Sequence, residues 1–277
     1  MSKLIFFDID GTLLNARMQV PQSTADALKI LQEQGHKIAI CSGRPLTMIY
    51  PFLLEMGFDG VIASAGAYIR YGDELLYRST LEQEPLEMLT ELLERHRTAY
   101  YLQGCPGSFL TEKSWETIRN VFSGGKSAET IRKDMKICEN PATVQGMESG
   151  VYVHSDATVA KMQKEVDEQI NGYFKLTGCS FGSDIIYSGE ITKKGVNKAT
   201  GMQRLMDAMG IAREDTVAFG DGSNDFEMIE YAATGIVMGN GIPALKERAD
   251  YVTTDIDADG IWNGLAHLKL LPERAGC

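Results

Sequence analysis

The chain has 277 residues with 27 basic and 38 acidic side chains, which gives a formal net charge of −11. At roughly 150 residues per domain, this length indicates one large domain or two modest ones. The 44% of hydrophobic residues excludes a disordered chain. The acidic balance argues against nucleic acid and membrane surfaces as partners. Because no apolar run approaches the ~18 residues of a membrane span and acids follow soon after the first residue, we expect a cytoplasmic protein.

Cysteine usage agrees with a reducing compartment. The five cysteines are scattered, form no CxxC pair and have no histidine at zinc spacing; they are Cys41, Cys105, Cys138, Cys179 and Cys277. We therefore expect free thiols, with neither a disulfide framework nor a zinc site.

The first eighty residues alternate strand and helix signals. Residues 3–10 (KLIFFDID) form a short apolar run that ends in acids, as a buried parallel strand does. Residues 23–34 have helical apolar spacing, with Ser23 as the expected N-cap and Gly35 as the stop. Two more strands are predicted at residues 36–42 and 60–64. This βαβαβ order predicts a parallel sheet with right-handed crossovers.

The last ninety residues repeat that pattern. Helices are predicted at residues 198–209 and 225–233, and strands at 216–219, 235–238 and 251–254. The two ends of the chain are thus expected to build one α/β domain with a Rossmann-like parallel-sheet core, formed by residues 1–82 and 189–277.

The pattern of predicted secondary structure is different in the residues between these two parts. Helices are predicted at residues 84–95 and 155–170, and strands at 99–102, 151–154 and 173–176. We interpret residues 83–188 as an inserted α+β module. Its polar and aromatic residues are each expected to serve packing or the surface rather than a ligand; the most prominent are Tyr101, Gln103, Trp115 and His154.

Candidate chemistry begins where the first predicted strand ends, at Asp8 and Asp10, which Gly11 and Thr12 follow. Because side chains alternate along a strand, the two carboxylates share a face if the strand stays regular. Two adjacent carboxylates repel unless one is protonated or a cation lies between them, and hard oxygen ligands at a strand end suit Mg²⁺. A solvated acidic turn is the alternative. The apolar run before the acids and the Gly-Thr after them favour a site.

The second strand ends in a segment that could hold a phosphate oxygen. Ser42 offers a hydroxyl, Gly43 an N–H that a ligand can approach closely, and Arg44 a guanidinium. Ser-Gly-Arg-Pro is also an ordinary turn, so this segment alone decides nothing.

Two further segments complete the pattern. Lys198 stands at the start of a predicted helix, where the helix dipole disfavours a cation; this position favours an anionic partner, although an exposed lysine is the alternative and Lys193 and Lys194 compete for the role. The loop at 220–225 (GDGSND) places two acids four residues apart between a strand and a helix, as a Mg²⁺ site or a solvated turn. The four segments together indicate phosphoryl transfer, because they place acids, a hydroxyl, a lysine and further acids at the strand ends of one parallel sheet.

With these motifs in this order, the sequence resembles the haloacid dehalogenase-like hydrolases, and within them the Cof-type phosphatases, which carry a large α/β cap. The resemblance covers essentially the whole chain. It rests on FFDIDGTLL (6–14), SGRP (42–45), GVNK (195–198), FGDGSNDFEMI (219–229) and VMGNG (237–241).

The resemblance implies a role for each acid. Asp8 would be the nucleophile that forms an aspartyl-phosphate, and Asp10 the general acid and then the general base. Mg²⁺ would be the cofactor, held by Asp8, the backbone carbonyl of Asp10, and Asp221, with Asp225 supporting the site from behind these ligands.

The resemblance also implies how the substrate is held. Ser42, Lys198 and Asn224 would bind the phosphoryl oxygens together with the N–H of Gly43. The inserted module would act as a lid that excludes water and selects the leaving group. The expected substrate is a small phosphorylated metabolite, such as a sugar phosphate.

Other readings compete with a phosphatase. A phosphomutase on the same scaffold would keep the phosphoryl group on an organic acceptor, and a non-catalytic relative would only bind the phosphometabolite. A receiver-type signalling module would need an acceptor aspartate at the end of the third strand, where this chain has Ala63, Ser64 and Ala65. Ala65 also stands where many relatives have asparagine, which affects the entrance between cap and core rather than the four motifs.

Overall fold

The computed structural model describes residues 2–121, 135–153, 155–178 and 188–273. The chain divides into two compact units. One comprises Met1–Ser42, Tyr50–Tyr77 and Asn197–Cys277, and is called the core unit below; the other comprises Gly43–Ile49 and Arg78–Val196, and is called the inserted unit.

The core unit is built on an eight-stranded sheet in the order β14-β13-β12-β1-β2-β3-β4-β5. The strands are β1 (Leu4–Phe7), β2 (Lys37–Cys41), β3 (Gly60–Ala63), β4 (Tyr68–Tyr71), β5 (Glu74–Arg78), β12 (Thr216–Gly220), β13 (Thr234–Val237) and β14 (Tyr251–Val252). Neighbours from β14 to β3 pair in parallel, as the βαβ order predicts. The sheet is α/β with a parallel centre, which confirms the predicted fold class.

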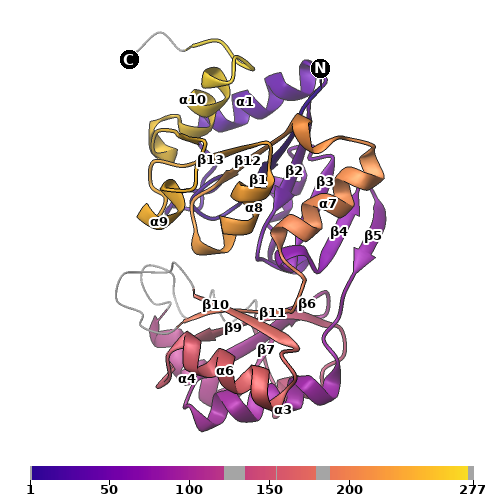
Figure 1. Cartoon of the computed structure of the whole chain (residues 1–277), viewed down its shortest axis with the longest axis vertical. Coiled ribbons are helices and arrows are strands. Elements are labelled where there is room, and N and C mark those ends of the chain that lie inside the picture. The colour runs from indigo at the N-terminus through magenta and orange to yellow at the C-terminus, as the bar shows by residue number, and fades with distance from the viewer. Residues whose placement is uncertain (1, 122–134, 154, 179–187, 274–277) are drawn as a thin grey trace. The chain divides into compact units, whose positions relative to one another are not determined.

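Helices cover both faces of this sheet (Figure 1). They are α1 (Gln22–Glu33), α2 (Pro51–Leu54), α7 (Lys198–Met209), α8 (Phe226–Tyr231), α9 (Pro243–Lys246) and α10 (Gly260–His267). Met202 and Leu205 of α7 and Met228 of α8 pack with Leu4 and Phe6 in one buried cluster. The alternate residue Phe7 stacks on Phe219 at 5.2 Å between ring centroids, on the face that Gly264 of α10 approaches.

Two details of the core unit differ from the sequence expectation. Ser23 is not an N-cap: α1 begins at Gln22, Pro21 precedes it without a side-chain cap, and Ser23 is buried in the first turn. Beyond β3 the chain turns back, and β4 pairs with it antiparallel. Because β5 is largely exposed along its length, its sequence lacks the continuous apolar run that marks the central strands.

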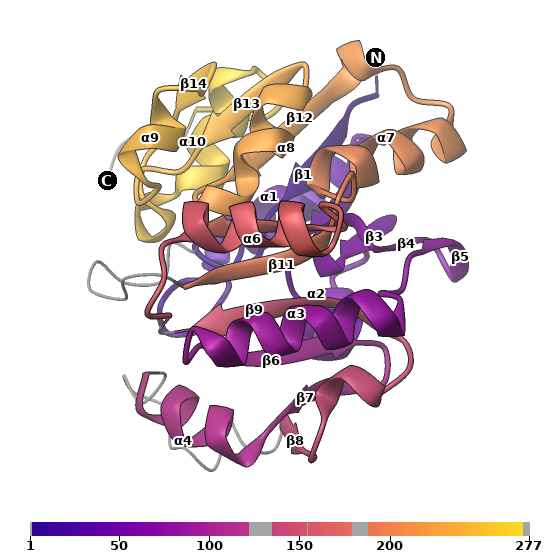
Figure 2. The ribbon, with the colours of Figure 1, turned by 60° about the horizontal axis from the view of Figure 1, so that its bottom comes forward.

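The inserted unit has its own six-stranded sheet in the order β10-β11-β9-β6-β7-β8. The strands are β6 (Ala99–Gly104), β7 (Gly107–Leu110), β8 (Met135–Ile137), β9 (Met147–Val153), β10 (Phe174–Gly178) and β11 (Gly189–Lys193), and the helices are α3 (Gln83–Arg95), α4 (Glu112–Val121) and α6 (Val159–Gln169). Helices α3 and α6 lie on one face of the sheet (Figure 2). Tyr100 and Leu102 pack on that side, whereas Ala99 and Tyr101 join a second cluster with Trp115 of α4.

The unit boundaries lie outside the predicted insertion of residues 83–188. Strand β11 pairs antiparallel with β9 and β10, so residues 189–193 belong to the inserted unit's sheet. Residues Gly43–Ile49, which follow Ser42, also belong to this unit. There Gln103 Nε2 donates to the Gly43 carbonyl at 3.1 Å, and Thr47 Oγ1 donates to the Gly104 carbonyl at 3.2 Å.

Other sequence expectations have these outcomes. Within the described residues, no helix is long and apolar enough to cross a membrane. Cys41, Cys105 and Cys138 are free thiols, while Cys179 and Cys277 lie outside the described residues, as does His154. Trp115 is buried among apolar side chains, in line with its expected packing role.

Candidate active site

Three neighbouring parallel strands of the core unit end beside one another and carry polar residues. Asp8 follows β1, Ser42 follows β2, and Asp221 follows β12. Because the carboxyl ends of parallel strands meet at one edge of the sheet, ligands bind there in folds of this class. Asp8 is 4% exposed and Ser42 is 2% exposed, so both side chains lie below the molecular surface.

Lys198 lies between two of the predicted acids. Its Nζ is 2.5 Å from Asp8 Oδ1 and 2.5 Å from Asp225 Oδ1, and its side chain is 1% exposed. Lys198 is the first residue of α7, whose N-terminus is closed by a capping box from Asn197. The helix dipole disfavours a lysine there, which is why we predicted an anionic partner for Lys198. The carboxylates of Asp8 and Asp225 are such partners.

The competing lysines have other surroundings. Lys193 Nζ lies 3.1 Å from Glu82 in the inserted unit, and Lys194 is exposed. Among the described residues, Lys198 is the one lysine or arginine that is buried. It is therefore the lysine that the structure brings to the predicted acids.

Asp225 organises the loop that carries Asp221. Its Oδ2 accepts hydrogen bonds from the N–H groups of Asp221 and Gly222, each at 2.9 Å, while its Oδ1 faces Lys198. Gly220 leaves room for this carboxylate, because a Cβ there would meet it at 2.7 Å. Both oxygens of Asp225 thus have protein partners, which favours a supporting role over direct contact with an ion.

Thr12, for which we predicted no role of its own, connects Asp221 to the first motif. Thr12 Oγ1 donates to Asp221 Oδ1 at 2.9 Å, and Thr12 is fully buried. Gly11 adopts a φ of 86°, and a Cβ at this position would collide with the Asp221 carboxylate. The Gly-Thr pair of the motif therefore lets the Asp221 carboxylate approach the loop that carries Asp10. The available signal in the sequence was a hydroxyl residue directly after Asp10-Gly11, which could have indicated the contact of Thr12 with the second acidic loop.

The site holds more negative charge than its lysine balances. Burial raises the pKa of Asp8 well above 3.8, and the neighbouring carboxylates of Asp225, Asp221 and Asp10 raise it further, against the opposing effect of Lys198. Burial and then Asp225 raise the pKa of Asp221 from 3.8 to about 7. Each shift records the free-energy cost of placing like charges together in a buried site.

This charge imbalance is what a divalent cation would relieve. One carboxylate oxygen from each of Asp8, Asp221 and Asp225 lies within 4.8 Å of the others. Carboxylate oxygens are the ligands that hard divalent cations prefer. Since both oxygens of Asp225 are engaged, Asp8 and Asp221 are the carboxylates whose chemistry fits direct coordination.

The remaining predicted residues have these positions. Asp10 follows β1 by three residues and forms an isolated bridge with Leu14, and its charge acts on both Asp8 and Asp221. Asn224 lies in the 3₁₀ turn Ser223–Asp225 that follows β12. Arg44 Nη1 donates to the Met48 carbonyl at 3.0 Å, so this guanidinium helps to close its own loop.

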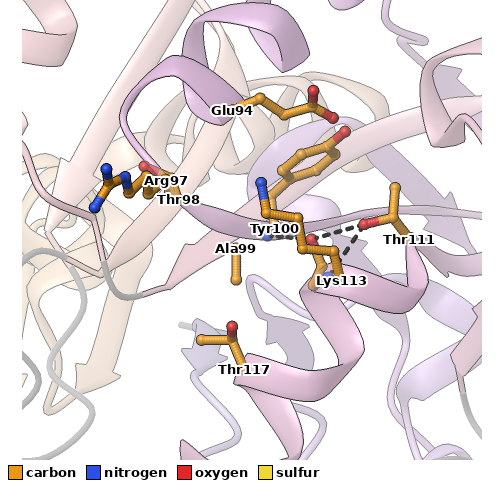
Figure 3. Close-up of a pocket in the computed structure, with 9 residues that line it drawn as sticks. Glu94, Arg97, Thr98, Ala99, Tyr100, Thr111, Lys113 and Thr117 are labelled. Carbon is orange, nitrogen blue, oxygen red and sulfur yellow. Dashed lines mark hydrogen bonds between the residues drawn. The ribbon is translucent and has the colours of Figure 1, made fainter.

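A small cavity lies in the inserted unit, and none of the predicted site residues lines it (Figure 3). It has a volume of about 20 Å³ and is lined by residues of β6 and α4 and of the segments beside them, among them Tyr100, Thr111 and Thr117. This volume admits about one water molecule and no metabolite. The cavity is therefore not the substrate site.

Comparison with known proteins agrees with this geometry. The profile of the haloacid dehalogenase-like hydrolase family matches residues 5–265. The chain is 30% identical to the putative phosphatase YkrA of Bacillus subtilis over 98% of this chain and 99% of the relative. It is 25% identical to the 5-amino-6-(5-phospho-D-ribitylamino)uracil phosphatase YitU of Bacillus subtilis, over 93% of this chain and 94% of that one.

Solved structures show the same architecture along the whole chain. A sugar phosphatase of haloacid dehalogenase subclass IIB superposes with a TM-score of 0.79 at 27% identity, covering 98% of this chain and 100% of the other. A member of a phosphoryl-transfer superfamily superposes with a TM-score of 0.82, also at 27% identity, over 98% of this chain and 100% of that one. The chain therefore belongs to the haloacid dehalogenase-like hydrolase family, as a Cof-type phosphatase that hydrolyses phosphoric monoesters.

Proposed function

We propose that this protein is a Mg²⁺-dependent phosphatase of small phosphorylated metabolites, with sugar phosphates as the principal class, and that it works through an aspartyl-phosphate on Asp8. The observation that carries the proposal is the buried arrangement of Lys198 between Asp8 and Asp225, beside Asp221. An acid that must attack a phosphorus atom needs its carboxylate oriented, and Lys198 orients that of Asp8. The charge of the substrate must also be offset, which Lys198 does in part and a cation held by Asp8 and Asp221 would complete.

In the first step, a carboxylate oxygen of Asp8 attacks the phosphorus atom, and the bond from phosphorus to the leaving alcohol oxygen breaks. Asp10 gives its proton to that oxygen, so the product is a neutral alcohol rather than an alkoxide. Lys198, the Ser42 hydroxyl, the Gly43 N–H and Asn224 hold the phosphoryl oxygens, on which negative charge is concentrated.

In the second step, a water molecule attacks the same phosphorus atom. Asp10, now ionised, takes a proton from the water as the bond from phosphorus to the Asp8 oxygen breaks. Inorganic phosphate is released, and both carboxyl groups return to their starting states. Asp10 is the residue that distinguishes a hydrolase from a long-lived phosphoacceptor.

Mg²⁺, when bound, supplies positive charge that offsets the phosphate and the carboxylates around it. Asp8 and Asp221 would hold it with their carboxylates and Asp10 with its backbone carbonyl, while Asp225 supports them through Lys198 and the 221–222 peptide groups. Because the site's acids outnumber Lys198, a phosphate dianion would be repelled without such a cation.

The names of the relatives support the substrate class. One acts on sugar phosphates and another on a phosphorylated ribitylamino compound, and both substrates join a phosphate to a polyhydroxylated carbon chain. We further propose that the inserted unit is a cap that selects the leaving group.

The test is release of inorganic phosphate from a panel of hexose phosphates, pentose and pentitol phosphates, nucleotides and an aryl phosphate. Each is assayed with Mg²⁺ and again with EDTA. Release that requires Mg²⁺ and is fastest for the sugar and pentitol phosphates is the expected result. Metal-independent release would contradict the cofactor. Transfer of the phosphoryl group to a second sugar without free phosphate would indicate a mutase instead.

A further inference from the structure

The turn that follows β13 contacts the first acidic loop, although the mechanism above gives this turn no part. It comprises residues 239–242, which are the last three residues of the VMGNG segment (237–241) and Ile242. Asn240 Nδ2 donates to the carbonyl oxygen of Gly11 at 2.8 Å, and Asn240 Oδ1 accepts from the N–H of Ile256 at 3.0 Å. Both ends of one amide side chain are therefore engaged, and one of them holds the residue directly after Asp10.

The same turn contacts the second acidic loop. The N–H of Ile242 donates to the Asp221 carbonyl oxygen at 3.0 Å. Gly241 lies so close to this loop that a Cβ on it would be 3.3 Å from the Asp221 Cα. Since Thr12 Oγ1 also donates to Asp221 Oδ1, the contacts close a ring that runs from Gly11 through Thr12, Asp221 and the turn back to Gly11.

The turn is itself firmly held. Met238 N–H donates to the Gly220 carbonyl at 3.0 Å, and Gly239 N–H donates to the Thr254 carbonyl at 2.9 Å. Lys246 Nζ donates to the Gly239 carbonyl at 2.5 Å. The atoms that hold Gly11 are thus fixed to the sheet on one side and to α9 on the other.

We propose that Asn240 is a positioning residue for Asp10. Gly11 has a φ of 86°, and its N–H donates to the Leu14 carbonyl at 2.8 Å, so its own carbonyl is the end of this residue that another segment must hold. The hydrogen bond from Asn240 fixes the carbonyl of that peptide, and with it the direction in which Asp10 presents its carboxyl group. This inference rests on the proposed function, in which Asp10 moves protons at the leaving oxygen and at water.

Two substitutions separate the two hydrogen bonds of Asn240. Asn240→Ala removes both. Asn240→Asp keeps an oxygen that can accept from Ile256 but places an acceptor where the donor to Gly11 had been. Asn263→Ala is the matched control: Asn263 Nδ2 donates to Thr254 and Ala258 in the neighbouring loop and touches neither Gly11 nor Asp221.

The readout is kcat/KM for two substrates, an alkyl sugar phosphate and para-nitrophenyl phosphate. The alkyl leaving group needs a proton from Asp10, whereas nitrophenolate leaves without one. We expect both Asn240 variants to lose about 10- to 100-fold with the alkyl substrate, as misplaced catalytic groups do, and several-fold less with the aryl substrate. The inhibition constant of inorganic phosphate should stay at its wild-type value, and Asn263→Ala should match the wild type in kcat/KM with both substrates.

Three outcomes would overturn the inference. Wild-type kcat/KM in Asn240→Ala would show that the hydrogen bond has no role. Wild-type kcat/KM in Asn240→Asp alone would assign the effect to Ile256. Equal losses with both substrates, together with weaker phosphate inhibition, would show a general disturbance of the site. Failure of the proposed function is distinguishable, because the wild-type protein would then release no phosphate from either substrate.

Discussion

Asp8 is a buried acid whose charge the fold accommodates poorly, although Lys198 lies beside it. Burial and the surrounding carboxylates raise its pKa, so a neutral amide of the same shape should be tolerated. We predict that Asp8→Asn loses at least about 10³-fold in kcat, because an amide is not a nucleophile toward phosphorus. Its thermal midpoint should equal or exceed that of the wild type.

Phosphate release and thermal unfolding check this prediction together. Asp73→Asn, in the exposed turn between β4 and β5, is the matched control and should change neither quantity. Near-native turnover of Asp8→Asn would remove Asp8 from the nucleophile's role. A lower midpoint would show that its ionised form stabilises the fold.

Asp221 gives the site a pH dependence. Its pKa is raised from 3.8 to about 7, so the folded protein binds this proton more tightly than the unfolded chain does. Without a metal, the contribution of this group to the free energy of unfolding therefore falls as pH rises from about 4 to 7. A cation that binds the Asp221 carboxylate must displace the proton, so its affinity rises over the same range.

We predict that Mg²⁺ raises the thermal midpoint much more at pH 8 than at pH 5.5. The apparent dissociation constant for Mg²⁺ should rise by about tenfold for each pH unit below 7 through displacement of the Asp221 proton, and more steeply where Asp8 is protonated as well. Titrations by calorimetry at several pH values would measure this slope. An affinity that is equal at pH 5.5 and 8 would contradict the assignment of Asp221 as a ligand.

At the scale of elements, the segment after β3 carries backbone strain. Ser64, Ala65 and Gly66 have φ values of 49°, 52° and 103° in succession. Positive φ values are disfavoured for most residues other than glycine and asparagine. Ala65 N–H donates to the Ser42 carbonyl at 3.0 Å, and Gly66 lies against the backbone of Asn197. The strained turn thus supports both the loop of Ser42 and the start of α7.

Replacing Ala65 by glycine should relieve part of this strain. The left-handed conformation costs an alanine about 1–2 kcal/mol, which offsets the roughly 0.8 kcal/mol lost with its buried methyl group. Ala67 is equally buried but has a φ of −78°, so Ala67→Gly loses the methyl group and gains nothing. We predict that Ala65→Gly is more stable than Ala67→Gly by at least about 1 kcal/mol in denaturant unfolding. The reverse order would mean that the turn is not strained.

The sequence predicted elements well where burial is continuous. The strands at 216–219 and 60–64 lie within a residue of the observed ones, because a parallel strand covered on both faces is apolar throughout. Helix α7 ends as expected, with Gly210 in the left-handed conformation. The exposed strand β5 and the missing cap at Ser23 were not predictable in this way, because tertiary packing decides them.

The same distinction holds for the site. The acids at the strand ends could be found because parallel strands share an edge. The hydrogen bonds of the two Asp225 oxygens and of the Asn240 amide could not be predicted from the sequence. Each of these bonds depends on which backbone N–H or carbonyl group a distant loop places beside the side chain. The sequence pattern predicts which polar residues lie at the strand ends, whereas the hydrogen-bond partners of those residues are known only from the folded structure.

At the scale of the whole molecule, each unit has its own buried core. One cluster joins strands β1, β2 and β12 to α7 and α8, and separate clusters join the second sheet to α3, α6 and α4. We predict that calorimetric unfolding departs from a single two-state transition. Because Asp8 and Asp221 both lie in the core unit, Mg²⁺ should raise the transition of that unit and leave the other in place. A single transition that moves as a whole would contradict this.

Residues Gly43–Ile49 give the inserted unit a second, short piece of chain, which leaves and rejoins the core unit on its own. If the inserted unit selects the substrate, as proposed above, an exchange of this unit between relatives would have to carry two segments, this one and Arg78–Val196. A graft of the long segment alone would leave the Gly43 carbonyl facing a foreign residue in place of Gln103, one peptide away from Ser42. Such a graft would then change substrate preference and phosphate binding at the same time, in engineered chimaeras and in natural recombinants alike.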